Sequence, residues 1–436
     1  MKTNEVLGVE DCFRHQTCGW ANVRIEDKMD CRDGKADTDG VSSEGGLGCA
    51  IPAEGQIYLD HAAATPLDPR VRTAMEPYES RLFFNPSSPY LPAVRVRRDF
   101  EQARADLAHA IGGRPSEVVL TAGATESINL AFAAVDGHAV TSKVEHAAVL
   151  ACARARDCTF VDVDAQGSVS PDAVAAALQP DTQLVSIGLA NNEIGTIQPI
   201  RAIARVVRDE RRRRLAEGST VPLYFHCDAS QGAGQTDIST ASLGVDMLTL
   251  NAAKIYGPKQ VGLLWALRGV RLRPRVVGGG QERGLRSGTE NVAGAIGFAC
   301  ALGSAVDGRK AEAKRLAALR DRLQKELTTA FPQAVVSGAM RHRLPGHLHI
   351  AFPGIDAERV VFILEDRGVL VGTGAACAAN RETRSHVLEA IGMPSDLADG
   401  SLRLTFGRLS TAENTDRAAR ILIESVRGEY ERMGLR

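Results

Sequence analysis

A carboxylate and a lysine follow two apolar runs in the middle of the sequence. The run YFHCDA reaches Asp228, and the run DMLTLNAA leads to Lys254, with the turn pair Gly257 and Pro258 just beyond. Both charges are therefore expected at strand ends, where open α/β sheets usually bind ligands. Enzymes that use pyridoxal 5'-phosphate (PLP) need such a pair: an amine that forms a Schiff base and an acid that keeps the pyridinium nitrogen charged. An exposed lysine and a turn-forming aspartate would give the same spacing.

The elements that would position this pair are predicted by alternating strand and helix patterns. Apolar runs and helical stretches alternate from about residue 118 to residue 254, which predicts an α/β fold with a mostly parallel central sheet and helices on both faces. An amphipathic run over 93–112 predicts a surface helix. A charged run over 305–330 predicts a long helix that leads into a smaller α+β domain.

Three regions follow from these patterns: an N-terminal extension (1–55), a large PLP-binding domain (56–310) and a small C-terminal domain (311–436). The extension is polar, without helical or strand periodicity, and is expected to be disordered. Its cysteines lack the close pairs of a zinc site, and no metal site is expected; they are Cys12, Cys18, Cys31 and Cys49. Two alternatives to a disordered extension remain open: a tail whose cysteines relay sulfur, and a start codon later in the sequence.

Composition excludes several classes of partner. With 52 basic and 53 acidic residues the formal charge is −1, so no nucleic acid or anionic membrane surface is expected as a partner. The basic run Arg211 to Arg214 is interpreted as the solvated end of a surface helix. No apolar stretch is long enough to span a bilayer, and no signal-peptide pattern is present. Nine cysteines, an odd number, fit a reducing compartment, so the cytoplasm is expected.

A phosphate site is predicted where an apolar strand turns into a helix through small residues. The segment VVLTAGATESINLAFAAV (118–135) would place backbone N–H groups and a hydroxyl at a helix N-terminus, from Gly123, Ala124 and Thr125. A plain N-cap at Thr125 is the alternative.

Eight segments together carry a family resemblance. They are YLDHAAATPLDPRV (58–71), LTAGATESINLA (120–131), SKVEHAAVL (142–150), NNEIGTIQPI (191–200), HCDASQG (226–232), KIYGPK (254–259), GGGQERGLRSGTEN (278–291) and LRLTFGR (402–408). In this combination and order they resemble cysteine desulfurases of the NifS/IscS type. These PLP-dependent enzymes of fold type I, in the class V aminotransferase superfamily, take sulfur from L-cysteine. The resemblance runs from about Ile57 to the C-terminus.

The resemblance implies roles around the cofactor. His146 would stack on the PLP ring and shuttle protons, and Asn192 would contact the ring's phenolic oxygen and the substrate. Asp228 would hold the pyridinium nitrogen, while Gln231 would reach the phenolic oxygen. Lys254 would be the Schiff-base lysine and the base that removes the α-proton. Taken singly, a histidine after a strand would more often be structural.

It also implies roles at the edge of the site. Thr289 would reach the phosphate of the neighbouring subunit, which implies a homodimer with sites at the interface. Arg403 would grip the substrate carboxylate; alone, it could equally form a surface ion pair. Cys377, in a run of small residues that predicts a loop, aligns with the nucleophilic cysteine. Core packing is expected for the other cysteines outside the extension: Cys152, Cys158, Cys227 and Cys300.

The sequence departs from the family pattern near the lysine. A serine and a histidine usually donate to the phosphate there, but the positions hold Asn251 and Ala253. Asn251 can donate through its amide, whereas Ala253 cannot, and one lost donor to a charged oxygen costs roughly 1.5–3 kcal/mol. The serines beside the usual nucleophile are also replaced, by Gly374, Ala375 and Ala376.

The sequence predicts a cysteine desulfurase that converts L-cysteine into L-alanine and a persulfide on Cys377. The persulfide would pass to an acceptor protein for iron–sulfur clusters, tRNA thiolation or another thio-product. Two alternatives remain: a PLP-dependent lyase or aminotransferase of the same superfamily that does not use Cys377, and a catalytically weak scaffold that binds a partner.

Overall fold

The main sheet has seven strands in the order β2-β8-β7-β6-β5-β3-β4. All neighbours from β7 to β4 are parallel, whereas β8 is antiparallel to both β2 and β7. The computed structural model describes residues 55–373 and 384–434. The strands are β2 (Val118–Thr121), β3 (Ala139–Ser142), β4 (Cys158–Val161), β5 (Leu184–Ser186), β6 (Tyr224–Asp228), β7 (Met247–Asn251) and β8 (Gly262–Ala266).

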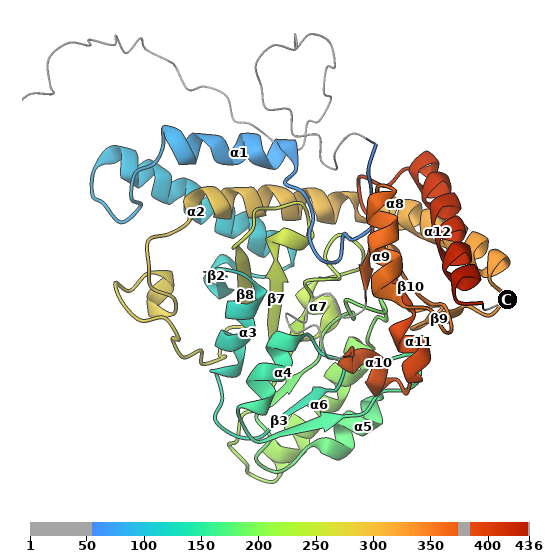
Figure 1. Cartoon of the computed structure of the whole chain (residues 1–436). Coiled ribbons are helices and arrows are strands. Elements are labelled where there is room, and N and C mark those ends of the chain that lie inside the picture. Colours follow the sequence, from blue (N-terminus) through green and yellow to red (C-terminus); the bar gives the residue numbers. More distant parts are fainter. Residues whose placement is uncertain (1–54, 374–383, 435–436) are drawn as a thin grey trace, which may run out of the picture. The chain divides into compact units, whose positions relative to one another are not determined.

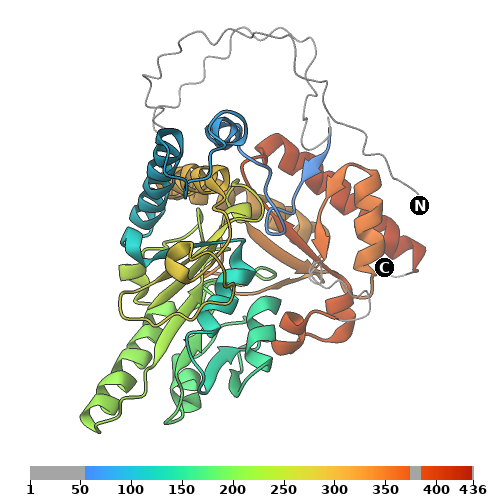
Figure 2. The same ribbon diagram turned by 90° about the vertical axis from the view of Figure 1, so that its left-hand side faces the viewer.

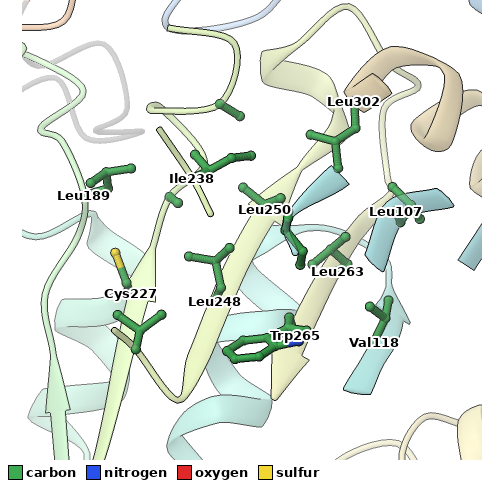
Figure 3. Packing of buried hydrophobic residues seen from close by; sticks show 14 of the residues in the cluster. Leu107, Val118, Leu189, Cys227, Ile238, Leu248, Leu250, Leu263, Trp265 and Leu302 are labelled. Carbon is green, nitrogen blue, oxygen red and sulfur yellow. The ribbon is translucent and has the colours of Figure 1, made fainter. Parts of the chain in front are cut away.

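Both faces of this sheet are apolar, and helices cover both. Along β8, Leu263 and Trp265 belong to one buried cluster and Leu264 to another, because successive strand residues point to opposite faces. Figure 3 shows the first cluster, where β7 and β8 pack with Leu107 and Leu302 from two helices. The predicted fold class, a mostly parallel sheet covered on both faces, is confirmed.

The helices up to the middle of the chain follow the predicted alternation. The helix expected over 93–112 spans Leu91–Ala110, and its N-terminal turn contains Pro92. The bounds are α1 (Pro69–Ser80), α2 (Leu91–Ala110), α3 (Ala124–Phe132), α4 (Ala147–Arg154), α5 (Pro171–Ala177), α6 (Ile200–Ala216) and α7 (Thr240–Leu243), with short 3-10 turns η1 (Pro115–Glu117), η2 (Ala252–Lys254) and η3 (Glu282–Gly284).

The helix expected over 305–330 is longer than predicted. It forms α8 (Val292–Ala330), because the small-residue run before residue 305 is helical as well. Figure 1 shows α1 and α2 alongside α8. Gly297 permits the close approach of α1, since a Cβ atom there would lie 2.6 Å from the sulfur of Met75.

The C-terminal elements surround a second sheet, of four antiparallel strands in the order β12-β13-β10-β9. The helices α9 and α12 pack on it (orange to red in Figure 2). A separate parallel pair joins β1 to β11. The bounds are β1 (Ile57–Tyr58), β9 (Val335–Ser337), β10 (His347–Ala351), β11 (Val369–Leu370), β12 (Gly372–Thr373), β13 (Ser401–Thr405), α9 (Ala357–Asp366), α10 (His386–Ala390), α11 (Ser395–Asp399) and α12 (Ala412–Arg432).

The predicted boundary at residues 310/311 falls inside α8. Leu302 of this helix packs in the core of the main sheet, whereas Leu316 and Leu323 pack in the core of the C-terminal sheet. One continuous helix therefore serves both cores, and the proposed domain division remains a prediction. Residues 1–54 of the predicted extension, including its four cysteines, lie outside the described residues.

The interpretation of the basic run Arg211 to Arg214 was wrong at its last residue. Arg214 is 3% exposed, pairs with Glu210 at 2.6 Å, and donates to the main-chain oxygens of Gln179 and Thr182. Arg211 donates to Asp246 and to the oxygen of Leu223. Arg211 and Arg214 therefore hold α6 against neighbouring parts of the main-sheet region. Of the four residues in the run, Arg212 and Arg213 are exposed. No helix in the described parts of the chain is long and apolar enough to cross a bilayer.

Candidate active site

Eight of the predicted site residues line one pocket, although they come from five stretches of the chain. The pocket lies at the carboxyl ends of β6 and β7, since Asp228 ends β6 and Lys254 lies in the η2 turn after β7. The predicted residues in its lining are Ala124, Thr125, His146, Asn192, Asp228, Gln231, Asn251 and Lys254.

The amine of Lys254 is held by main-chain oxygens. Its Nζ donates to the oxygens of Ala62 and Ala63 at 2.8 and 2.7 Å, and Gln231 Nε2 donates to the same Ala62 oxygen at 3.1 Å. The lysine turn is also clamped by Thr65, whose Oγ1 donates to the oxygen of Ala253 and accepts from the N–H of Tyr256. The segment after β1 therefore fixes both the turn and the amine.

Asp228 presents its carboxylate to the pocket. Within the described chain, its side-chain hydrogen bonds fall on Oδ1, which accepts from the Ser230 N–H at 3.0 Å and from the Ser230 hydroxyl at 2.6 Å. Oδ2 is then available for a cation. This arrangement suits a protonated ring nitrogen.

The N-terminus of α3 and the end of β7 form the anion-binding side of the pocket. Gly123 precedes the helix with φ of 138°, a conformation that favours glycine, and Ala124 and Thr125 begin the first turn. Asn251 accepts the Ala253 N–H through Oδ1 at 3.2 Å, which leaves its amide NH₂ as a donor. These donors fit a phosphate, so the residues present fit PLP at both of its ends.

His146 follows β3 and caps α4. Its Nδ1 accepts the Ala148 N–H at 3.1 Å, so the proton of the neutral ring lies on Nε2. Solvent reaches the ring, yet the surrounding protein atoms desolvate it and lower the pKa of His146 below its ordinary value. The ring is therefore expected to be neutral at physiological pH, which suits stacking on an aromatic cofactor.

Glu145 also lines the pocket and was missed by the sequence analysis. It is 5% exposed; its Oε1 accepts from Ser142 Oγ at 2.6 Å, and its Oε2 accepts from the Gly188 N–H at 2.9 Å. Burial raises the pKa of Glu145 to about 8, and the nearby Asp228 carboxylate adds to the rise. At neutral pH the Glu145 carboxyl is therefore mostly protonated.

Glu145→Gln is expected to remove part of the pH dependence of stability. The folded protein binds a proton at Glu145 up to pH about 8, whereas the unfolded chain releases it near 4.5. The contribution of this raised pKa to the free energy of unfolding is complete below the lower pKa, and it is lost as pH rises through the upper pKa. The difference in unfolding free energy between wild type and variant should fall across this window in urea titrations. A difference for Glu145→Gln that stays constant with pH would contradict the assignment.

Arg403 is buried beside the pocket and does not line it. It is 1% exposed on β13, where its Nη2 donates to Asp60 Oδ1 at 2.7 Å and its Nη1 donates to the main-chain oxygen of Asn192 at 3.3 Å. The alternative of a surface ion pair is therefore wrong, because the pair is internal. Arg403 Nε has no hydrogen-bond partner among the described residues, so a donor remains for a substrate carboxylate.

Two predicted site residues remain, and of these Thr289 is not part of the pocket lining. Thr289 is exposed in the loop between β8 and α8, next to Glu290, which pairs with Arg97 at 2.7 Å. Cys377 lies outside the described residues. Of the remaining cysteines, Cys227 and Cys300 are buried, and Cys152 and Cys158 pack against a buried cluster as expected. No group of three or more potential metal ligands occurs in the described ranges.

Sequence reasoning missed two parts of the site. The carbonyls of Ala62 and Ala63 hold Lys254, yet main-chain oxygens leave no signature in residue types. Glu145 did leave one: a charged residue directly after an apolar strand, beside His146, within a segment already singled out.

Known proteins resemble this chain along most of its length. The profile of the family described as Aminotransferase class-V matches residues 57–418. Cysteine desulfurase IscS of Dictyoglomus turgidum is 39% identical over 371 residues, covering 82% of this chain and 91% of the relative. Cysteine desulfurase IscS 1 of Archaeoglobus fulgidus is 38% identical over 388 residues, covering 86% of this chain and 97% of the relative.

Solved structures agree with the sequence relatives. A NifS-like protein superposes with a TM-score of 0.79 at 32% identity, covering 86% of this chain and all of that one (100%). A structure titled "SspA in complex with cysteine" superposes with a TM-score of 0.68 at 32% identity, covering 80% of this chain and 98% of the other. The chain therefore belongs to the class V aminotransferase family and, within it, to the cysteine desulfurases.

Proposed function

We propose that this chain binds PLP in the pocket at the ends of β6 and β7 and uses Cys377 to accept sulfur from L-cysteine. The observation that carries the proposal is the convergence of Asp228, Lys254 and the α3 N-terminus on that one pocket. PLP, when bound, supplies an electron sink for charge that develops at the substrate's α-carbon. The site can take the ring nitrogen at Asp228 and the phosphate at α3 and Asn251.

The side chains divide the remaining work. Lys254 Nζ takes the proton from the α-carbon, and Arg403 with Asn192 orients the substrate through its carboxylate. The Cys377 thiolate attacks the substrate sulfur, so an S–S bond forms and the C–S bond breaks. The electron pair of that bond passes to the substrate carbon, which takes up a proton. L-alanine leaves, and a persulfide remains on Cys377.

Product identity tests the reaction. Purified protein with PLP, L-cysteine and a reductant should release alanine. Pyruvate and ammonia would instead indicate the lyase alternative, and the absence of a PLP absorption band would favour the scaffold.

In the proposed reaction an acceptor protein then takes the sulfur from the Cys377 persulfide. We place the reaction in the cytoplasm, because a nucleophilic thiol needs reducing conditions.

Asn251 is expected to contribute to PLP affinity. Asn251→Ala should weaken PLP binding about tenfold, because a hydrogen bond to a charged oxygen is lost. Asn251→Asp should weaken it further, since the carboxylate keeps the acceptor for the Ala253 N–H but repels the phosphate. Equilibrium dialysis of PLP would measure both. The reverse order of the two variants would show that Asn251 acts through the turn alone.

We also propose that the enzyme is a homodimer whose interface includes the loop between α1 and α2. Phe83 and Tyr90 of this loop are 69% and 50% exposed, and Leu91 at the start of α2 is 74% exposed. An aromatic and aliphatic cluster of this kind suits a partner's surface. Thr289, exposed on its own chain, could then reach the partner's phosphate site. A monomeric mass at sedimentation equilibrium would contradict the dimer.

A further inference from the structure

The helix α10 is docked on two pocket loops, immediately after the segment that carries Cys377. Ser385 caps this helix: its Oγ accepts the N–H groups of Val387 and Leu388 at 3.2 and 3.3 Å. The same hydroxyl donates its proton to Glu193 Oε2 at 2.5 Å. Glu193 follows Asn192, which lines the pocket.

The next residue makes a second contact, on the other loop. His386 Nε2 donates to the main-chain oxygen of Glu145 at 2.9 Å, and Glu145 directly precedes His146. The helix thus contacts the loop of the expected ring-stacking histidine as well as the loop of the expected substrate contact.

Apolar packing joins the same three pieces. Val387 and Leu388 of α10 form a buried cluster with Val144 and Ile194, which lie beside the polar contacts on the two loops. All four side chains are at most 4% exposed. Hydrogen bonds and packing therefore fix the position of α10 relative to the pocket.

The chain that precedes the Cys377 segment is also fixed at the site. Gly372 of β12 is paired with Arg403 of β13. A Cβ atom at Gly372 would lie 2.9 Å from Asp60 Oδ1 and 3.0 Å from Arg403 Nη2, so only glycine fits against this ion pair without displacement. The described residues on both sides of the segment are therefore held by residues of the site.

We propose that Ser385 and His386 are positioning residues for sulfur transfer, with Glu193 as the buried acceptor that holds Ser385. This inference rests on the proposed function, because it assigns the positioning of the Cys377 thiol to Ser385 and His386 at the start of α10. Glu193 is 6% exposed, contacts Ser385 and is not among the residues that line the pocket. Burial raises the pKa of Glu193 to about 7, and the hydroxyl of Ser385 opposes this rise.

The test separates substrate binding from sulfur transfer. Ser385→Ala should lower alanine formation at saturating cysteine by about tenfold to a hundredfold, as expected when reacting atoms are misplaced by about 1 Å. The PLP content and the cysteine concentration that half-saturates the spectral change of bound PLP should stay within about twofold of wild type. Ser395→Ala, an exposed serine at the start of α11, is the matched control and should behave as wild type.

Conservative variants distinguish positioning from folding. Ser385→Thr keeps the hydroxyl and Glu193→Gln keeps an acceptor oxygen, so both should retain most of the turnover, whereas Glu193→Ala should resemble Ser385→Ala. His386→Gln keeps an N–H donor and should exceed His386→Leu in turnover. If the defects of Ser385→Ala and Glu193→Ala multiply in the double variant, the two residues do not act through one contact.

The outcomes also separate this inference from the proposed function. Normal turnover in Ser385→Ala would overturn the inference alone. The inference would also be overturned if Ser385→Ala lost PLP content, cysteine binding and turnover to the same extent and Ser385→Thr restored none of them. A wild-type protein that forms no Cys377-dependent alanine would overturn the proposed function, and the inference with it, because no sulfur transfer would remain to be positioned.

Discussion

Lys254→Ala is expected to lower alanine formation from L-cysteine by at least about a thousandfold. In the proposed reaction this amine binds PLP covalently and takes the α-proton, and general base catalysis alone contributes about 10²- to 10⁴-fold. The absorption of enzyme-bound PLP should change at the same time, because the cofactor would be held only by noncovalent contacts. Single-turnover alanine formation and the visible spectrum would report both effects.

Lys259 offers a matched control in the same segment. Lys259 is an exposed residue whose amine donates to the Thr65 main-chain oxygen at 2.6 Å, and it lies outside the pocket lining. Lys259→Ala should keep the PLP spectrum and most of the turnover. If Lys259→Ala, and not Lys254→Ala, abolished the reaction, the lysine assignment would be wrong.

Cys377→Ser is expected to abolish net alanine formation, again by a thousandfold or more, because the serine hydroxyl is a poor nucleophile toward sulfur. PLP binding and the spectral change with cysteine should persist, since the described residues of the pocket lining are unchanged. The measurement is alanine release together with detection of the protein persulfide by mass spectrometry.

Cys152 provides the comparison for Cys377. It is partly exposed on α4 and packs against a buried cluster away from the pocket lining. Cys152→Ser should keep both alanine release and persulfide formation. Alanine release at the wild-type rate from Cys377→Ser would sink the proposed role of the thiol and favour the lyase or aminotransferase alternative.

Local sequence patterns predicted the elements whose position depends mainly on residues that are close in sequence. The periodicity of 93–112 predicted α2 within two residues at each end, because an amphipathic face and a terminal glycine pair define a helix by themselves. Asp228 and Lys254 were predicted beside strand ends for the same reason, since each follows an apolar run.

Long-range contacts could not be predicted in this way. Arg403 and Asp60 are 343 positions apart, and nothing near either residue indicates that they form a buried pair. The burial of Arg214 likewise depends on main-chain oxygens 32 and 35 positions away, so the helix pattern alone suggested a solvated end. Cys377 was recognised from family resemblance, and its placement remains a prediction.

The way in which the Ala62 and Ala63 carbonyls are held in place has a consequence for biosynthesis. Residues near the beginning of the described chain hold Lys254, yet they are themselves held by residues near its C-terminal end: β1 pairs with β11, and the Ala62 N–H donates to Thr405 Oγ1 at 2.9 Å. On the ribosome, the main-sheet strands and Lys254 emerge long before β11 and β13. We therefore expect the nascent chain to complete its lysine site only after nearly all of the protein has been translated, so that cofactor capture becomes a late event of folding.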